Sequence, residues 1–214
     1  MKMLVRIVLS GCFFVRTAAA EQRVLIEPSA FRIVERDSGP VNYYSVVREG
    51  GLAFVRSQYR PPLKTSVLGW QMPDAGRAGA RGLSWSWRAR TLPAGGDECV
   101  SGKGDSAASI YATWKRGLRY YSLKFSWTSR GTVGAICARK RNPFVAQDTI
   151  VLRVGPRDGW QHEKVNLREL FRKHFEDGDQ KAEVPDFVGV GILTDGDQTR
   201  SESSADVGSF VVVY

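Results

Sequence analysis

The sequence predicts an all-β protein: an antiparallel β-sandwich of the jelly-roll or galactose-binding-like type, with one short helix. From about residue 42 onward, short segments with alternating apolar and polar side chains are separated by clusters of Gly, Pro and Asp. A single segment has apolar residues at helical spacing. The 214 residues are enough for one domain with a sizeable core and too few for two comfortable ones.

The alternation is clearest in GLSWSWRART, residues 82–91. In a strand, one face would carry Leu83, Trp85, Trp87 and Ala89, and the other would carry Ser84, Ser86, Arg88 and Arg90. SIYATW and RYYSLKFSWT follow the same rule, which predicts strands with one buried face, as in antiparallel sheets. In NYYSVVREGGLAFVRSQY, the pair Gly50-Gly51 predicts a tight hairpin turn because glycine tolerates positive φ angles.

The predicted helix lies in NLRELFRKHF, residues 166–175, where Leu167, Leu170, Phe171 and either His174 or Phe175 share one side. Asn166 is the expected N-cap, with Glu169 three residues later in an approximate capping box.

Residues 1–20 have the features of an export signal, with early basic residues, a short apolar run and three alanines before Glu21. An alternative is a lipoprotein acylated at Cys12, since Leu9-Ser10-Gly11-Cys12 resembles a lipobox. We expect residues 21–41 to be a lead-in and 42–214 to be the domain. The predicted location is the periplasm or the exterior, and no segment is apolar enough to be a transmembrane span.

The net charge of the whole chain is +9, and removal of residues 1–20 leaves 31 − 3 = 28 basic against 22 acidic residues, or +6. This charge is spread along the chain, and its one dense run, residues 139–141, is typical of a solvated loop. Because no basic stripe accompanies a recognisable motif, we expect no nucleic-acid partner. After export Cys99 and Cys137 remain, and they would form a disulfide or stay as two buried thiols.

The segment GILTDGDQTR, residues 191–200, carries two carboxylates directly after an apolar run. A phosphatase nucleophile is excluded because only fifteen residues follow Thr199, too few for the rest of that fold. A loose calcium site is one interpretation, with ligands from Asp105, Asp195, Asp197, Thr199 and Asp206. The alternative is a turn whose side chains bond to its own amides without any metal.

Signals for catalysis are weak. The two histidines cannot form a HExxH zinc site, and no G-x-S-x-G elbow is present, so we expect a binding protein more than an enzyme. A pair of acidic residues for glycoside hydrolysis stays open. The expected ligand contacts lie on polar strand faces: Arg88, Arg90, Tyr120 and Lys124, with Tyr111 beside them if strands pair in sequence order. The competing interpretation is an ordinary solvated sheet face.

An ordered set of segments resembles the bacterial domain of unknown function 3047: LSWSWRARTLP, GDSAASIYATW, YYSLKFSWTS, DTIVLRVG, GWQHEKVNLRELFRKHF and VGVGILTDGDQTRSESSADVGSFVV. It covers most of residues 42–214. In the family's Thr-Asp-Thr-Asp-Asn-Thr loop, Thr194, Asp195, Asp197 and Thr199 match, whereas Gly196 and Gln198 depart. The resemblance implies an exported protein with no assigned activity. The last third is also similar to the ending of jelly-roll carbohydrate-binding modules, a likeness of fold that does not fix function.

We therefore expect an exported protein that binds a glycan or an envelope saccharide without catalysis. The alternatives are a hydrolase that acts on envelope polysaccharide through acidic residues, and a structural envelope protein. Calcium is the one cofactor that the residues suggest.

Overall fold

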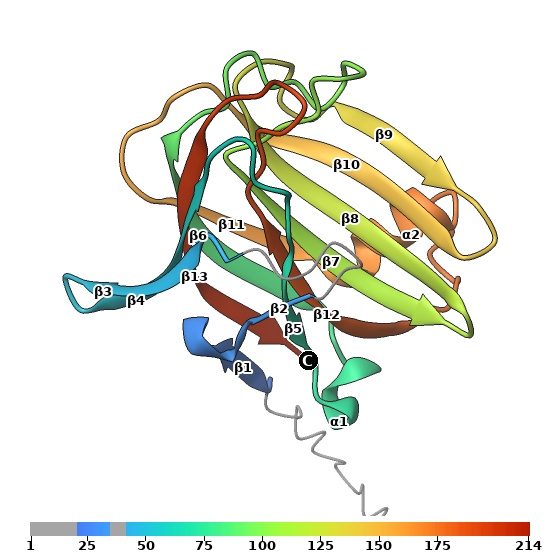
Figure 1. The fold of residues 1–214 in the computed structure, drawn as a ribbon. Coiled ribbons are helices and arrows are strands. Elements are labelled where there is room, and N and C mark those ends of the chain that lie inside the picture. The colour runs from blue at the N-terminus through green and yellow to red at the C-terminus, as the bar shows by residue number, and fades with distance from the viewer. Residues whose placement is uncertain (1–20, 35–41) are drawn as a thin grey trace, which may run out of the picture.

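The computed structural model describes residues 21–34 and 42–214. The predicted signal peptide, with Cys12, and residues 35–41 lie outside the described residues. Two sheets pack face to face (Figure 1), which confirms the predicted β-sandwich of jelly-roll type. Within the described ranges, none of the helices is both long enough and apolar enough to cross a membrane.

Sheet A has six strands in the order β11-β6-β13-β4-β3, with β1 also paired to β13. Their bounds are β1 (Arg23–Ile26), β3 (Tyr44–Glu49), β4 (Leu52–Tyr59), β6 (Gly82–Thr91), β11 (Gln161–Asn166) and β13 (Ser203–Val213). The β3–β4 hairpin turns at Gly50-Gly51, whose φ angles are 57° and 79°, as predicted. In Figure 1 this hairpin projects beyond the body of the sandwich.

Sheet B has seven strands in the order β2-β5-β12-β7-β8-β10-β9. Their bounds are β2 (Arg32–Ile33), β5 (Leu68–Gln71), β7 (Ala108–Arg116), β8 (Arg119–Thr128), β9 (Ile136–Arg141), β10 (Val145–Val154) and β12 (Asp186–Leu193). The pair β8–β10 is parallel, unlike the other pairs described. It departs from the expected antiparallel pattern because β10 lies between β8 and the edge strand β9, so the chain returns in the direction of β8.

The predicted lead-in contributes to both sheets. The short strand β1 pairs with the end of β13, and β2 pairs with β5. A 3-10 turn, η1 (Pro28–Ala30), connects the two strands. Strands of four and two residues are too short to show an alternating pattern, so local sequence patterns contain no signal for them.

The main helix, α2 (Leu167–Phe175), forms where predicted. The Asn166 side chain accepts hydrogen bonds from the backbone N–H groups of Arg168 and Glu169, both at 3.1 Å, and so caps the helix. Leu167 and Phe171 are buried, and Phe171 packs 5.5 Å from the ring of Trp114. A second helix, α1 (Asp74–Arg77), is a single turn.

The core between the sheets is rich in tryptophan. Trp85 and Trp87 from β6, Trp114 from β7 and Trp127 from β8 are at most 1% exposed. The rings of Trp87 and Trp127 meet across the two sheets at 5.5 Å. The predicted alternation is thus confirmed for these four residues, and it leaves the neighbouring polar side chains of each strand on the outer faces.

Candidate functional site

A cleft of about 650 Å³ lies over the outer face of sheet B. Ile110 and Leu123 point into the core, so Tyr111 on β7 and Lys124 on β8 point the opposite way, into the cleft. Gln147 and Thr149 add polar groups from β10, and the loops around residues 98–104 and 195–198 form a wall. A cleft of this size suits a small ligand or part of a chain-like one.

Lys124 and Glu98 form an ion pair in the cleft. Lys124 Nζ lies 2.7 Å from Glu98 Oε1, and both side chains are less than a tenth exposed. Burial alone would lower the pKa of this lysine, but the nearby acidic groups of Tyr111, Asp195 and Glu98 outweigh it and raise the pKa above its usual value. The lysine therefore stays charged at physiological pH.

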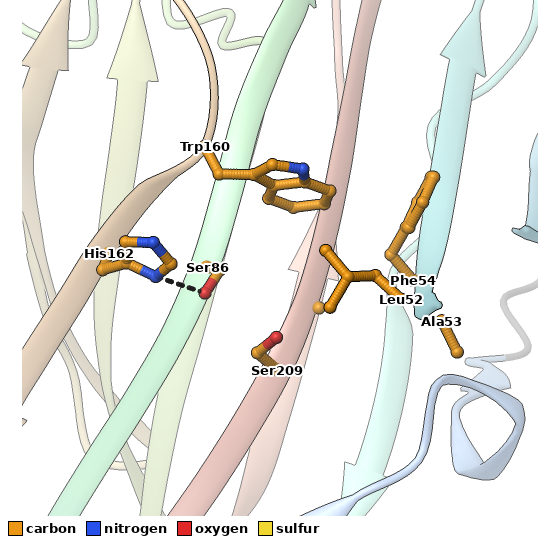
Figure 2. A pocket seen from close by; sticks show the side chains of 8 residues that line it. Leu52, Ala53, Phe54, Ser86, Trp160, His162 and Ser209 are labelled. Carbon is orange, nitrogen blue, oxygen red and sulfur yellow. Dashed lines mark hydrogen bonds between the residues drawn. The ribbon is translucent and has the colours of Figure 1, made fainter. Parts of the chain in front are cut away.

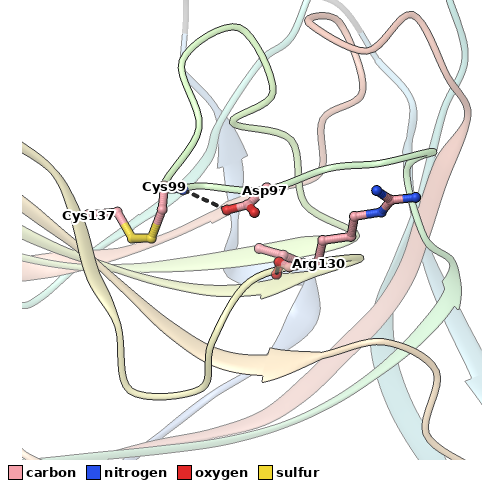
Figure 3. Close-up of a disulfide and its surroundings, with 5 residues drawn as sticks. Asp97, Cys99, Arg130 and Cys137 are labelled. Atoms are coloured by element: carbon pink, nitrogen blue, oxygen red, sulfur yellow. Dashed lines mark hydrogen bonds between the residues drawn. A yellow bond between two sulfur atoms is a disulfide. The ribbon is translucent and has the colours of Figure 1, made fainter.

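The predicted disulfide is confirmed between Cys99 and Cys137, whose Cα atoms are 4.9 Å apart (Figure 3). It ties the loop after β6 to strand β9. Asp97 Oδ1 accepts a hydrogen bond of 2.9 Å from the Cys99 N–H and closes a local turn. Because Glu98 lies between these two residues, the disulfide holds the glutamate that pairs with Lys124 in the cleft.

The acidic loop between β12 and β13 packs against the loop that precedes β7. Asp105 is fully buried and accepts hydrogen bonds from the Thr199 N–H and hydroxyl, both at 2.6 Å. Asp195 Oδ1 accepts from the Ser106 N–H at 2.8 Å. A Cβ at Gly196 would collide with the Ser201 carbonyl, so the loop requires glycine there. The metal-free interpretation placed such bonds within a single turn, whereas these hydrogen bonds join the turn to a loop about ninety residues earlier in the chain.

Asp105, Asp195 and Asp197 each offer one oxygen within 4.8 Å of the others. Burial, and to a lesser extent Glu98, raises the pKa of Asp195 to about 7, although Lys124 opposes this shift. Burial also raises the pKa of Asp197, and the charge of Asp105 adds to the effect. Three of the five predicted calcium ligands are therefore close together, and Thr199 contacts Asp105.

Asp206, the fifth predicted metal ligand, lies elsewhere. It is on the outer face of sheet A, fully buried under arginines, with Arg56 Nε and Arg88 Nε each 2.7 Å from its carboxylate. Its neighbour Ala205 points into the core, so strand alternation turns the Asp206 side chain away from the acidic loop. The expected grouping of Asp206 with the other carboxylates is wrong.

The five predicted ligand contacts do not form one surface. Arg88 and Arg90 are on β6 of sheet A, whereas Tyr111, Tyr120 and Lys124 are on β7 and β8 of sheet B. The expectation assumed that strands pair in sequence order, but the chain crosses from one sheet to the other between β6 and β7. Tyr111 and Lys124 line the cleft, and Tyr120 is 43% exposed on the same face, four residues before Lys124 along β8.

Glu98, Gln147 and Thr149 line the cleft and were not predicted as site residues. The Thr149 hydroxyl is buried without a hydrogen-bond partner among the described residues. In β10 three polar residues, Gln147, Asp148 and Thr149, follow one another and interrupt the alternation, so the local pattern does not show which of them line the cleft. Glu98 precedes a cysteine in a loop, and no local pattern marks it.

A second cavity, of about 170 Å³, lies on the outer face of sheet A (Figure 2). Leu52, Phe54 and Trp160 form its apolar part, and the Ser86 hydroxyl lies 2.7 Å from His162 Nδ1 on the other side. The guanidinium of Arg88 lies 4.8 Å from the centre of the Trp160 ring. Among the described residues that line the cavity, none is a carboxylate that could orient the histidine for nucleophilic catalysis.

The family described as "Protein of unknown function (DUF3047)" matches residues 41–211, which confirms the predicted resemblance. No curated protein matches the chain.

Solved structures with a similar arrangement include the family 11 carbohydrate-binding module from Clostridium thermocellum in complex with a β-1,3-1,4-mixed-linked tetrasaccharide. It has 8% identity and a TM-score of 0.45, over 91% of this chain and 96% of the module. The xyloglucanase domain of NopAA from Sinorhizobium fredii, in complex with cellobiose, has 9% identity and a TM-score of 0.45, over 92% and 100%. Structural similarity at such low sequence identity does not show that this chain shares the ligand or the activity of these proteins.

Proposed function

Since the chain belongs to the DUF3047 family, which brings no assigned activity, we propose from the geometry of the cleft that the protein binds a saccharide without catalysis. The ligand lies across β7, β8 and β10 on the outer face of sheet B. The main support for this proposal is that several polar side chains in the cleft have no hydrogen-bond partner among the described residues. Lys140 and Gln147 line it with side chains that form no hydrogen bond or ion pair within the described residues, and the Thr149 hydroxyl is buried without a partner.

A hydroxyl-rich ligand fits these groups. Saccharide hydroxyls both donate and accept hydrogen bonds, so they can satisfy the Thr149 hydroxyl, the Gln147 amide and the Lys140 ammonium at the same time. The Glu98–Lys124 pair offers charge-assisted hydrogen bonds to further hydroxyls. Tyr120, exposed on the same face, provides a ring on which a sugar can stack beyond the end of the cleft.

A glycan array followed by calorimetric titration of the bound saccharides tests the proposal. We expect Tyr120→Ala and Thr149→Val each to weaken binding about 3- to 10-fold, the loss of one stacking or hydrogen-bonding contact. Thr91→Val, at an exposed position on β6 of sheet A, is the matched control and should bind as wild type does. A silent array, or equal losses in Thr149→Val and the control, would reject the cleft as the binding site.

A second candidate function is glycoside hydrolysis. Three carboxyl groups line the cleft, and two of them lie in different environments: Glu98 is paired with Lys124, and burial raises the pKa of Asp195 to about 7. A protonated acid beside an ionised carboxylate is the arrangement that such hydrolysis requires. Asp195 would then be the acid, and activity would fall as the pH rises above about 7.

Release of reducing ends from the glycans that bind separates the two candidates. Hydrolysis predicts release by wild type and a loss of at least about 100-fold in Asp195→Asn and Glu98→Gln, while both variants still bind. Absence of release from every bound glycan would leave binding as the function.

Calcium at Asp105, Asp195 and Asp197 stays a prediction. Equilibrium dialysis of wild type and Asp197→Asn against calcium tests it, with Asp186→Asn, an exposed carboxylate at the start of β12, as the control. Calcium uptake that is lost only in Asp197→Asn would support the site. Equal uptake by all three proteins would reject it.

A further inference from the structure

Two turns lie side by side at one end of sheet B, next to α2 (Figure 1). They join β7 to β8 and β9 to β10, and the Tyr120 N–H donates a 2.8 Å hydrogen bond to the Phe144 carbonyl between them. Each turn presents a large apolar side chain to solvent: Leu118 is 80% exposed and Phe144 is 63% exposed. An isolated exposed apolar residue needs no explanation, but two neighbouring ones at adjacent turns make a small apolar projection.

Arginines surround this projection. A pocket of about 510 Å³ between the ends of β8, β9 and β10 and the helix α2 is lined by Arg116, Arg119, Arg139 and Arg141. Two of these residues are neutralised within the protein. Arg116 lies 2.9 Å from Glu176, and Arg141 lies 2.7 Å from Asp148, which His174 also contacts.

The other two arginines are not neutralised. Arg119 and Arg139 have no carboxylate partner among the described residues, and Arg119 Nε is buried without any hydrogen-bond partner. The Arg119 guanidinium lies 5.2 Å from the centre of the Tyr121 ring, which holds it in place. Because Arg119 lines the pocket, the part of its guanidinium that faces this space can bind an acceptor from outside, and anions with several oxygens match its geometry.

We propose that this end of the protein docks on an anionic lipid bilayer. The docking rim is defined as Arg116, Leu118, Arg119, Arg139, Arg141 and Phe144. Arg119 and Arg139 bind lipid phosphate groups, while Leu118 and Phe144 enter the interfacial layer.

The combination favours a bilayer over a free anion. A site for free phosphate needs the arginines but gains nothing from exposed Leu118 and Phe144, which cost free energy in water. At a membrane surface both features contribute, because apolar side chains enter the interface and each nearby arginine adds electrostatic attraction to anionic headgroups. The docking rim is at the start of β8, whereas Lys124 in the cleft is five residues farther along the strand, so docking does not require the cleft.

Cosedimentation with vesicles tests the proposal, with the protein lacking residues 1–20 so that no export signal or acyl anchor contributes. One set of vesicles contains equal parts of phosphatidylglycerol and phosphatidylcholine, and the other contains phosphatidylcholine alone. We expect binding to the first set only, and its loss at high salt. Arg119→Gln with Arg139→Gln should weaken binding about 10- to 30-fold. Leu118→Ser with Phe144→Ser should weaken it several-fold.

Matched controls remove the same groups elsewhere on the surface. Arg48→Gln with Arg157→Gln removes two exposed charges, and Leu63→Ser with Val133→Ser removes two exposed apolar side chains. Both controls should bind vesicles as wild type does. Circular dichroism of all variants verifies that they are folded. Because the substituted side chains lie at turns, at strand ends or on the edge strand β9, folding should be retained.

Three outcomes would overturn the proposal. Equal binding to the two kinds of vesicle would remove the role of lipid charge. Equal weakening in rim and control variants would mean that total charge or surface apolarity matters, not this rim. Binding of inorganic phosphate that depends on Arg119 and Arg139, without binding to vesicles, would identify the pocket as a site for a free anion.

Discussion

Two buried carboxylates, one on sheet A and one in the loop that follows β12 of sheet B, lie in opposite electrostatic environments. Asp206, on sheet A, is fully buried beneath Arg56, Arg88 and Arg90. Asp195, at the cleft on sheet B, is 5% exposed, and the lysine near it is already paired with a second carboxylate, Glu98. The two residues have the same chemistry and nearly the same burial, so the difference lies in the charges around them.

The pKa values follow from that difference. Burial alone would raise the pKa of Asp206, but hydrogen bonds from Arg56 and Arg88 lower it below its ordinary value. For Asp195, burial is the largest effect and Glu98 adds to it, so the pKa rises to about 7. Three cations for one carboxylate make a stable structural cluster, whereas one cation among several carboxylates leaves a group that can still exchange a proton. We therefore expect Asp206 to stabilise the fold and Asp195 to serve the function of the cleft.

The largest expected effect comes from breaking the Asp206 cluster. Asp206→Ala leaves Arg56 and Arg88 with Glu49 alone, which is largely exposed, and leaves Arg90 without a carboxylate partner among the described residues. Loss of a buried partner from an ion-pair network should lower the free energy of unfolding by about 3 to 5 kcal/mol. Urea denaturation measures this loss, and Glu202→Ala, which removes an exposed partner of Arg60, should change stability by less than about 1 kcal/mol. Similar values for the two variants would contradict the structural role of Asp206.

The next effect concerns the loop that carries Glu98. Replacing both Cys99 and Cys137 with serine removes a cross-link between residues 38 apart and should cost about 2 to 4 kcal/mol in unfolding free energy. Because the cross-link also holds Glu98 against Lys124, saccharide binding should weaken in the same variant, whereas Asp206→Ala should leave the affinity of the folded protein unchanged. Denaturation and calorimetric titration measure the two quantities. Unchanged affinity without the disulfide would separate Glu98 from binding.

The sequence predicted the parts of the fold that local patterns encode. The alternation in residues 82–91 placed Trp85 and Trp87 in the core, and Asn166 marked the start of α2. Local patterns do not state which sheet a strand joins. The same alternation that put Arg88 and Lys124 on polar faces could not tell that these faces belong to different sheets.

The candidate site was predicted in part for the same reason. Asp195 and Asp197 are near each other in the sequence. Asp105 lies in a turn about ninety residues earlier, so its grouping with them required the assumption that the two loops meet at one edge of the sandwich. Asp206 was misplaced because its position in the sequence, shortly after Asp197 and Thr199, does not show that it lies in a strand, where alternation directs its side chain to the outer face of sheet A. Glu98 and Thr149 enter the cleft through the disulfide and through the insertion of β10 beside β8, both set by tertiary structure.

A pH series sharpens the contrast between the carboxylates. The folded-state pKa of Asp195, about 7, lies above its ordinary value of 3.8, so the unfolded chain releases this proton at a lower pH than the folded chain does. Its contribution to stability is therefore full below about pH 4 and is lost as the pH rises toward 7, with a slope of up to about 1.4 kcal/mol per pH unit. Asp195→Asn should lack this slope in urea denaturation. Parallel profiles for variant and wild type would contradict the raised pKa.

The smallest effect is expected at the edge of the Asp206 cluster. Arg90 lies 3.4 Å from Asp206, farther than Arg56 and Arg88, and its side chain is 45% exposed. Water screens such a pair, so Arg90→Gln should lower the free energy of unfolding by only about 0.2 to 1 kcal/mol. The substitution also tests Arg90 as a predicted ligand contact, because it leaves the sheet B cleft intact. A loss of saccharide affinity in Arg90→Gln without a loss of stability would move the binding site to sheet A and reverse the roles that the comparison gives to the two regions.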